Sequence, residues 1–421
     1  MTTTLICTVG GSHEPVVKAI EHLRPDHVCF VCSDDDPATG SKGSYIQITG
    51  KGNIIKASFR DEKPTLPNIP AQAGLREEQF TVLRVQPDSL DDIYHRLTTW
   101  IGERDRQAER VIADYTGGTK TMSAALVAAA LDEGVDLQLV SGSRSNLLKV
   151  ESGAEYVSPA AATESRFRRQ LARALTAWQR FAYDEAAFML DKLTPPTGPK
   201  LRGQFERAVA VSQALAAWDR FDHEAAREIL SRYRPKLGAA WKEWFTILEI
   251  LLDDKRGDPM RLFDLWRNAQ RRADNRRYDD AVARAYRLLE WSAQWILFTK
   301  AGIETKDVPK DKIPEDMALT VNRQGKYQAG LYNAWALAAH HCGNTIADFW
   351  EKEKETMMDR VQLRNHSILA HGFTPMEEQA WKKMETWIEE RLLPLLLSLA
   401  REEPYRLRRL PAQLPNFFRG L

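Results

Sequence analysis

Two groups of residues in this chain of 421 have the types and the spacing that chemistry requires. The first is a pair of glycine loops, Gly10-Gly11-Ser12 and Thr116-Gly117-Gly118-Thr119-Lys120, each of which follows a β-rich run. Glycines let the backbone approach a ligand, free N–H groups at the start of a helix attract anions, and Lys120 adds a positive charge. Together the loops predict a site for a phosphate-bearing ligand such as a nucleotide, although either loop alone also fits a tight strand-to-helix turn.

Two common nucleotide-binding motifs do not fit these loops. A nicotinamide-type loop requires GxGxxG, whereas the first loop reads Gly10-Gly11-Ser12-His13-Glu14-Pro15. A Walker A loop requires Gly immediately before Lys-Thr and another Gly five positions earlier, and those places hold Thr119 and Asp114. The sequence therefore disfavours a dehydrogenase and a P-loop NTPase.

The second group lies in the segment 363–372, LRNHSILAHG. Arg364 and His371 are seven residues apart, so on one continuous helix they would share a face about 10 Å apart along the axis. Gly372 and Pro375 predict that this helix ends after His371, where the helix dipole favours a protonated imidazole. A guanidinium and an imidazolium suit phosphoryl chemistry, because Arg stabilises phosphate oxygens while His transfers a proton. A buried helix with a capping His would leave the same pattern.

Three other clusters carry weaker signals. Cys29 and Cys32 are three apart in an expected strand, so their side chains face opposite sides and indicate core rather than a metal or redox site. The run 34–36, Asp-Asp-Asp, precedes Pro-Ala-Thr-Gly and is typical of a solvated loop. The His340-His341-Cys342 run has adjacent His side chains that diverge on a helix, so no metal site is expected there.

The elements that position the glycine loops can be predicted from hydrophobic patterning. Short β-branched runs predict strands at 5–9, 27–31, 80–85, 111–115 and 135–140, with helices at 14–23, 90–103 and 121–132 between them. This alternation predicts a parallel, Rossmann-like α/β sheet whose carboxyl edge carries both loops. Ser141 and Arg144, expected just after the fifth strand, are weaker candidates for the wall of the site, and residues 51–77 form an irregular insertion.

After Ser158-Pro159 the β-rich runs give way to helical patterns rich in Ala, Arg, Leu and Trp. AWQRFAYDEAA (177–187) recurs as AWDRFDHEAA (217–226), and a fainter copy begins at Arg276. Unrelated helices that reuse one packing solution would also explain the repeat. We predict a Rossmann-like domain at 1–158, an all-α linker at 159–270 and an all-α domain at 271–421.

Composition limits the class of protein. With 59 Lys+Arg against 58 Asp+Glu the net charge is +1, which argues against a DNA-coating surface, and 43% hydrophobic residues exclude wholesale disorder. Four cysteines are too few for a disulfide scaffold, and the longest apolar stretch, 392–400, is too short to span a bilayer. We expect a cytoplasmic protein with no membrane or DNA partner.

These residues resemble two known modules. DYTGGTKTMSAAL (114–126), together with TVGGS (8–12), is similar to the CARF domain, the CRISPR-associated Rossmann fold, with Asp114, Thr116 and Lys120 at its pattern positions. RNHSILAHG (364–372) is similar to the Arg–x(4–6)–His motif of HEPN ribonucleases, with Asn365 after the Arg as in many members. CARF domain, helical linker and HEPN domain in that order cover almost the entire chain.

The resemblance implies an ancillary effector of type III CRISPR systems, in which a homodimer binds a cyclic oligoadenylate through its CARF pair and then cleaves RNA at a composite HEPN site. Cyclic tetra-adenylate is the favoured ring and hexa-adenylate is possible; the insertion at 51–77 leaves ring size open, and no cofactor is expected. We assign ligand contacts to Gly10, Gly11, Ser12, Asp114, Thr116, Gly117, Gly118, Thr119, Lys120, Ser141 and Arg144.

The residue types in the HEPN segment favour cleavage of single-stranded RNA without metal. The C-terminal region offers no carboxylate cluster near Arg364 and His371, and RNA carries its own nucleophile, the 2′-OH. With Arg364, Asn365 and His371 as the catalytic residues, the expected products end in a 2′,3′-cyclic phosphate. Two alternatives are a ring nuclease that degrades the activator in the CARF domain, using Thr116, Thr119 or Lys120, and a non-catalytic, ligand-gated binding module.

Overall fold

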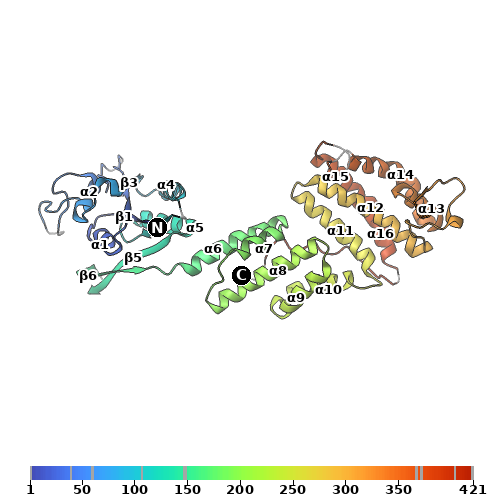
Figure 1. The fold of residues 1–421 in the computed structure, drawn as a ribbon, viewed down its shortest axis with the longest axis horizontal. Coiled ribbons are helices and arrows are strands. Elements are labelled where there is room, and N and C mark those ends of the chain that lie inside the picture. The colour runs from blue at the N-terminus through green and yellow to red at the C-terminus, as the bar shows by residue number, and fades with distance from the viewer. Residues whose placement is uncertain are drawn as a thin grey trace. The chain divides into compact units, whose positions relative to one another are not determined.

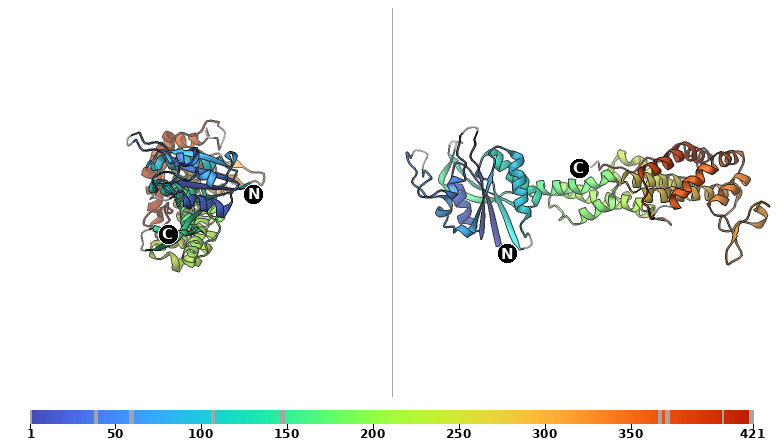
Figure 2. Two further views of the ribbon diagram at one scale, coloured as in Figure 1. Left: turned by 90° about the vertical axis from the view of Figure 1, so that its left-hand side faces the viewer. Right: turned by 90° about the horizontal axis from the view of Figure 1, so that it is seen from above.

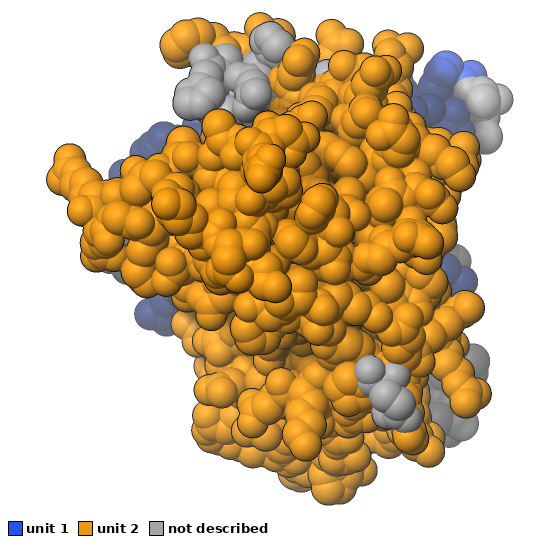
Figure 3. All heavy atoms as spheres, turned by 90° about the vertical axis from the view of Figure 1, so that its right-hand side faces the viewer, with its two compact units in different colours: residues 1–170 blue, residues 171–421 orange. Residues whose placement is uncertain are grey.

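The computed structural model describes residues 2–37, 40–57, 61–105, 108–145, 149–365, 368–369, 373–402 and 404–418. At 142–145, 149–155 and 363–365 it describes the backbone alone. The chain divides into two compact units, residues 1–170 and 171–421 (Figures 1 and 3), and each is described by itself below.

A six-stranded sheet forms the centre of the first unit (Figure 2). The strand order is β3-β2-β1-β4-β5-β6, with β1 (Thr2–Val9), β2 (His27–Ser33), β3 (Phe80–Val85), β4 (Glu109–Asp114), β5 (Asp136–Ser145) and β6 (Lys149–Pro159). The first five strands are parallel, and β6 pairs antiparallel with β5. The strand order reverses between β1 and β4, so their carboxyl ends lie side by side at the switch point where such sheets bind ligands.

Helices cover both faces of this sheet. α1 (Glu14–Leu23) packs on one face, and α4 (Leu90–Gly102) and α5 (Lys120–Glu133) pack on the other. Side chains alternate between the two cores with the period of two that a strand imposes: Ile6 belongs to the core beneath α4 and α5, and Leu5 belongs to the core beneath α1. The short helices α2 (Ile46–Thr49) and α3 (Ile69–Gln72) and a bridge between Ile55 and Leu66 cover the α1 side as well.

The same alternation confirms the interpretation of the CxxC pair. Cys29 lies in the core beneath α4 and α5, whereas Cys32 lies in the opposite core beneath α1. Burial raises the pKa of the Cys29 thiol to about 12, so it stays protonated. Within the described residues, no group of three or more His, Cys, Asp or Glu side chains could hold a metal ion.

Helices dominate the second unit, apart from a small hairpin of β7 (Thr320–Val321) and β8 (Tyr327–Gln328). Neighbouring helices in the chain pack on one another, as α8 does on α9 and α11 does on α12. The helices from the unit boundary onward are α6 (Thr163–Leu175), α7 (Tyr183–Asp191), α8 (Pro199–Asp219), α9 (His223–Leu237), α10 (Lys242–Leu251), α11 (Gly257–Asp274), α12 (Tyr278–Ala301), α13 (Leu331–His341), α14 (Asn344–Asn365), α15 (Glu378–Trp387) and α16 (Leu393–Ala400).

The sequence repeat is also a repeat of backbone geometry. Phe181 and Phe221 both adopt the left-handed conformation, with φ of 55° and 67°. Their N–H groups bond to the carbonyls of Trp178 and Trp218, at 2.9 and 2.8 Å, and the next N–H reaches five residues back. Arg276, where the faint third copy begins, has φ of 58° and the same two bonds. This is the Schellman arrangement that ends a helix, so all three copies end one helix and start the next in the same way.

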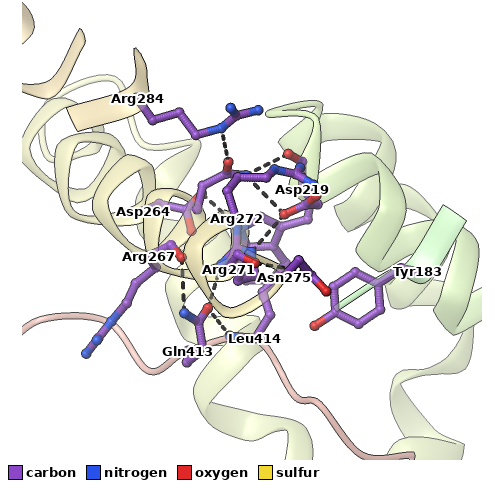
Figure 4. A network of polar contacts seen from close by, with 12 residues as sticks. Tyr183, Asp219, Asp264, Arg267, Arg271, Arg272, Asn275, Arg284, Gln413 and Leu414 are labelled. Carbon is purple, nitrogen blue, oxygen red and sulfur yellow. Dashed lines mark hydrogen bonds and ion pairs between the residues drawn. The ribbon is translucent and has the colours of Figure 1, made fainter. Parts of the chain in front are cut away.

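The C-terminal tail, residues 404–418, packs against these repeated helices (Figure 4). The guanidinium of Arg267 donates from Nε to the Pro411 carbonyl at 3.0 Å, and the Gln413 amide donates back to the Arg267 carbonyl at 3.1 Å. The hydroxyl of Tyr183 donates to the Pro415 carbonyl at 2.8 Å. Helices more than 140 residues upstream in the sequence thus hold the tail in place.

The predicted fold class is confirmed: a Rossmann-like α/β domain is followed by an almost wholly helical region. β6 was not predicted, and α11 runs through the expected boundary at 270. The first unit extends to residue 170, past the expected boundary at 158. No helix among the described residues is long and apolar enough to cross a membrane.

Candidate functional site

The two glycine loops meet at the carboxyl edge of the sheet. A Cβ on Gly10 would lie 2.7 Å from the backbone nitrogen of Gly118, and a Cβ on Gly117 would overlap the carbonyl oxygen of Thr8. Gly118 itself has φ of 80°, which a residue with a side chain rarely adopts. Glycine is therefore required at these positions because the two loops contact each other closely. This contact brings together the candidate residues that follow β1 and β4.

Asp114 and Thr116 hold the second loop in shape. The Asp114 carboxylate is buried and accepts hydrogen bonds from the Thr116 N–H at 3.0 Å and from the Gln138 side chain at 3.2 Å. Burial raises the pKa of Asp114, and these hydrogen bonds oppose the rise. The Thr116 hydroxyl accepts from the Val140 N–H at 2.7 Å, which ties the loop to β5. Both side chains thus stabilise the conformation of the second loop through hydrogen bonds within the protein.

Other candidates are free to meet a ligand. Lys120 begins α5 with an exposed side chain, and Thr119 caps the helix by accepting from the Met122 N–H at 3.2 Å. Gly11 and Ser12 of the first loop are also exposed. An exposed cation at a capped helix N-terminus next to glycines is an arrangement suited to a phosphate.

Sequence reasoning missed Gln47. Its side-chain amide donates to the Gly10 carbonyl at 2.5 Å, so the insertion that contains α2 reaches the first glycine loop. No motif marks a lone Gln, and only the folded insertion shows the contact. Ser141 and Arg144 lie within β5 rather than after it, which corrects their expected position; of Arg144 only the backbone is described.

A cavity of about 420 Å³ lies elsewhere on this unit, at the amino ends of β4 and β5. Arg110, Asp136 and Arg166 line it, and Asp136 pairs with both arginines at 3.5 and 3.8 Å. None of the predicted site residues lines this cavity. We therefore place the candidate ligand site where the two glycine loops meet, and not at this cavity.

The segment that resembles the HEPN motif begins at the end of a helix in the second unit. α14 ends at Asn365, and Ile368 and Leu369 form a turn. The prediction that one helix carries Arg364 and His371 on a single face involves residues 370–372, which lie outside the described residues. Arg364 and Asn365 lie in the last turn of α14 with only their backbone described, and His371 lies outside the described residues.

The turn after α14 exposes apolar side chains. Ile368 is 54% exposed, Leu369 is 50% exposed and Phe373 is 96% exposed. These three exposed residues flank His371 in the sequence.

Comparison with known proteins bears on both units. Residues 254–393 match the family model of the Csm6 HEPN domain. The structure is similar to Enterococcus italicus Csm6 bound to cyclic hexa-2′-fluoro-hexa-dAMP, with a TM-score of 0.50 and 12% identity over 96% of each chain. Can2 from Sulfobacillus thermosulfidooxidans, in complex with cyclic tetra-adenylate, matches 55% of this chain and 69% of its own at 13% identity, with a TM-score of 0.23 that is too low to indicate a shared fold. No curated protein sequence matches the chain.

The fold and the family match define a class of architecture: a Rossmann-like α/β domain followed by a helical region that matches a HEPN domain, the arrangement of CARF–HEPN proteins. Within that class the architecture is Csm6-like, and the HEPN match contains the Arg364–His371 segment. The resemblance inferred from the sequence is thereby confirmed at the level of architecture.

Proposed function

We propose that this protein is a ribonuclease that a cyclic oligoadenylate switches on. The observation that supports this most strongly is the HEPN match at 254–393, which includes Arg364, Asn365 and His371 in a chain that also carries the converging glycine loops. One unit offers a phosphate-binding edge and the other offers the groups for RNA cleavage. With both functions in one chain, an activator that binds to the first unit could control RNA cleavage in the second unit.

The ligand proposal follows from the geometry at the carboxyl edge. A cyclic oligoadenylate carries several phosphates on a ring, and the exposed Lys120 beside the N-terminus of α5 suits one of them. Gly10, Gly11, Ser12 and the second loop would contact its backbone. The relative from Enterococcus italicus was solved with a six-membered ring analogue, but at 12% identity the ring size for this chain must be measured.

The cleavage proposal assigns a role to each group of the HEPN motif. Arg364 holds the scissile phosphate and stabilises its charge in the transition state, and Asn365 orients the substrate. The 2′-oxygen of the RNA attacks the adjacent phosphorus while the bond to the 5′-oxygen breaks, and His371 transfers a proton to or from one of these oxygens. The products are a 2′,3′-cyclic phosphate and a free 5′-hydroxyl, and the reaction requires no metal ion.

A two-fold dimer is part of the proposal. Each chain carries one Arg364–His371 motif, and the exposed Ile368, Leu369 and Phe373 beside it offer an apolar contact surface. In a dimer with C2 symmetry the same patch serves both copies, so the two motifs would meet in one composite site. Binding of the activator must then favour an active arrangement of the dimer, because a ligand shifts an equilibrium only by its differential affinity.

The proposed function can be tested with a fluorogenic single-stranded RNA and a panel of cyclic oligoadenylates of three to six units. We expect cleavage with one ring size, little without ligand and none with the His371→Ala variant. Equal cleavage by wild type and His371→Ala would refute the assignment of the catalytic site.

A further inference from the structure

Two neighbouring hollows follow the C-terminal tail where it contacts the start of α10. The larger, of about 590 Å³, lies along residues 406–411 of the tail, and the smaller, of about 360 Å³, lies along residues 413–417. Ala240 lines both, so the two hollows adjoin one another. We call them together the tail groove. Every residue named here as part of it is described and belongs to the second unit.

The larger hollow carries an excess of positive charge. Its basic side chains are Lys242, Arg406, Arg408 and Arg409, and its acidic side chain is Glu243, which pairs with Arg409 at 2.9 Å. Lys242 and Arg408 are exposed, and within the part of the chain that the structure describes neither has an acidic partner. The whole chain has a net charge of only +1, so cations are concentrated in this groove. A ligand that complements it is a polyanion.

Aromatic rings line the smaller hollow. Phe181 and Trp241 are buried there, whereas Trp244 is half-buried and Phe417 is 62% exposed. The ring centroids of Trp241 and Trp244 are 5.2 Å apart, and the Trp244 indole donates from Nε1 to the Gln413 carbonyl at 3.1 Å. This hydrogen bond fixes the orientation of the Trp244 ring against the tail.

Phe417 is exposed although the tail is anchored on both sides of it. Its neighbour Phe418 is buried and packs edge-on against Trp178, with 5.2 Å between the ring centroids. Two residues before Phe417, the Pro415 carbonyl accepts a hydrogen bond from the Tyr183 hydroxyl at 2.8 Å. An exposed aromatic ring on an anchored backbone loses little freedom when a ligand binds, so Phe417 is suited to stacking.

A basic hollow that adjoins an aromatic one is the combination that binds single-stranded nucleic acid, because cations follow the phosphates while rings stack on the bases. We propose that the tail groove is a binding site for single-stranded RNA outside the segment that resembles the HEPN motif. Lys242 and Arg408 contact phosphates, and Trp244 and Phe417 stack on bases. The choice of RNA rests on the proposed function. An acidic peptide would match the charges but does not require flat rings, so RNA accounts for both features.

The test measures binding of a labelled single-stranded RNA of about 12 nucleotides to the full-length protein by fluorescence anisotropy, without activator. Its 2′-O-methyl groups remove the nucleophile, so binding is measured without cleavage. Phe417→Leu removes the flat ring and keeps an apolar side chain, whereas Phe417→Tyr keeps the ring. Phe188→Leu is the matched control, because Phe188 is also 62% exposed in the second unit and lines neither hollow.

We expect Phe417→Leu to weaken RNA binding about fivefold or more, since loss of one base–aromatic stack costs at least that factor. Its melting temperature should stay unchanged because the ring is exposed. Phe417→Tyr and Phe188→Leu should bind within about twofold of wild type.

The charges are tested with the double variant Lys242→Ala/Arg408→Ala. Each phosphate contact on a single strand contributes about 0.7 to the slope of log affinity against log salt concentration, so this variant should flatten the slope by about 1.4. The control is Lys200→Ala/Arg227→Ala, which removes two exposed cations that do not line the groove and should leave the slope unchanged.

RNA binding within about twofold of wild type in Phe417→Leu would overturn the inference, and so would an unchanged salt slope in Lys242→Ala/Arg408→Ala, whether or not an acidic peptide binds the groove instead. A wild-type protein that cleaves no RNA with any activator would refute the proposed function, while the binding measurements would still decide whether the groove holds RNA. Activator-dependent cleavage by a protein whose groove variants bind RNA as wild type does would refute the groove alone.

Discussion

The guanidinium of Arg271 lies against the carboxylate of Asp219, with 2.7 Å between Nε and Oδ1, and only 1% of the Arg271 side chain is exposed. This pair joins α11 to the end of α8 (Figure 4). A charge taken out of water requires further partners, and Gln413 supplies one by accepting from Nη1 of Arg271 at 2.6 Å. The C-terminal tail thus adds an acceptor to a polar network inside the helical unit.

Removal of Gln413 should therefore destabilise the protein. In Gln413→Ala a buried guanidinium N–H loses its acceptor, and we expect the free energy of unfolding to fall by about 1–3 kcal/mol. The control is Arg409→Ala, which removes an ion pair with Glu243 whose side chains are 81% and 45% exposed, and should change stability by less than about 0.5 kcal/mol. Denaturant unfolding that shows equal, small effects for both variants would contradict this role of the tail.

The contact between the glycine loops can be tested with two adjacent substitutions. The new Cβ of Gly10→Ala would lie 2.7 Å from the backbone nitrogen of Gly118, so the loops must separate, and we expect a loss of about 1–3 kcal/mol. Gly11→Ala meets nothing within 4 Å and should leave thermal stability nearly unchanged. Scanning calorimetry of both variants measures this difference in thermal stability. A Gly10→Ala protein as stable as Gly11→Ala would show that the loops do not touch.

Lys120 should contribute to the affinity for the activator and not to the rate of cleavage. A charged contact to phosphate is worth about 1.5–3 kcal/mol, so Lys120→Ala should weaken binding of the activating ring at least about tenfold while the rate at saturating ligand stays unchanged. Arg96→Ala, which removes an exposed cation of α4 that pairs with Asp92, serves as the charge control. An unchanged midpoint of activation in Lys120→Ala would place the ligand elsewhere.

The buried Asp114 carboxylate should make stability depend on pH. Its folded-state pKa is raised, chiefly by burial, so the folded protein binds this proton more tightly than the unfolded chain does. Stability attributable to this group therefore falls as the pH rises from the ordinary carboxyl pKa through the raised one. Asp114→Asn removes that effect, so its melting temperature relative to wild type should increase from pH 4 to pH 7. A difference that is constant with pH, or one that shrinks, would contradict the burial argument.

Much of the Rossmann-like domain could be predicted because its signals are local. α1 spans the predicted residues 14–23, and five strands lie where β-branched runs indicated them. β6 was missed because Ser, Gly and Glu interrupt its pattern, and its stability comes from pairing with β5. The structural roles of Asp114 and Thr116 depend on Gln138 and Val140, two dozen residues later, which no local pattern connects to them.

In the segment that resembles the HEPN motif, prediction from the sequence is limited by contacts between distant residues. The sequence predicts a helix that carries Arg364 and ends after His371, and the structure describes its helix, α14, as far as Asn365. The amide of Ile368 donates a hydrogen bond to the carboxylate of Asp279 at 3.3 Å, a tertiary contact that the sequence pattern does not indicate. A contact across 89 residues cannot be inferred from spacing. The repeat around Trp178 and Trp218, by contrast, was visible because both copies use the same residues for the same turn.

Mass spectrometry of RNA cleaved by the full-length protein in EDTA, with and without the activating cyclic oligoadenylate, tests the proposed ribonuclease chemistry. We expect activator-dependent fragments that end in a 2′,3′-cyclic phosphate and begin with a 5′-hydroxyl, and no such fragments from His371→Ala or from RNA with 2′-O-methyl groups. Fragments with 5′-phosphate ends, a requirement for added magnesium, or full cleavage by His371→Ala would contradict it.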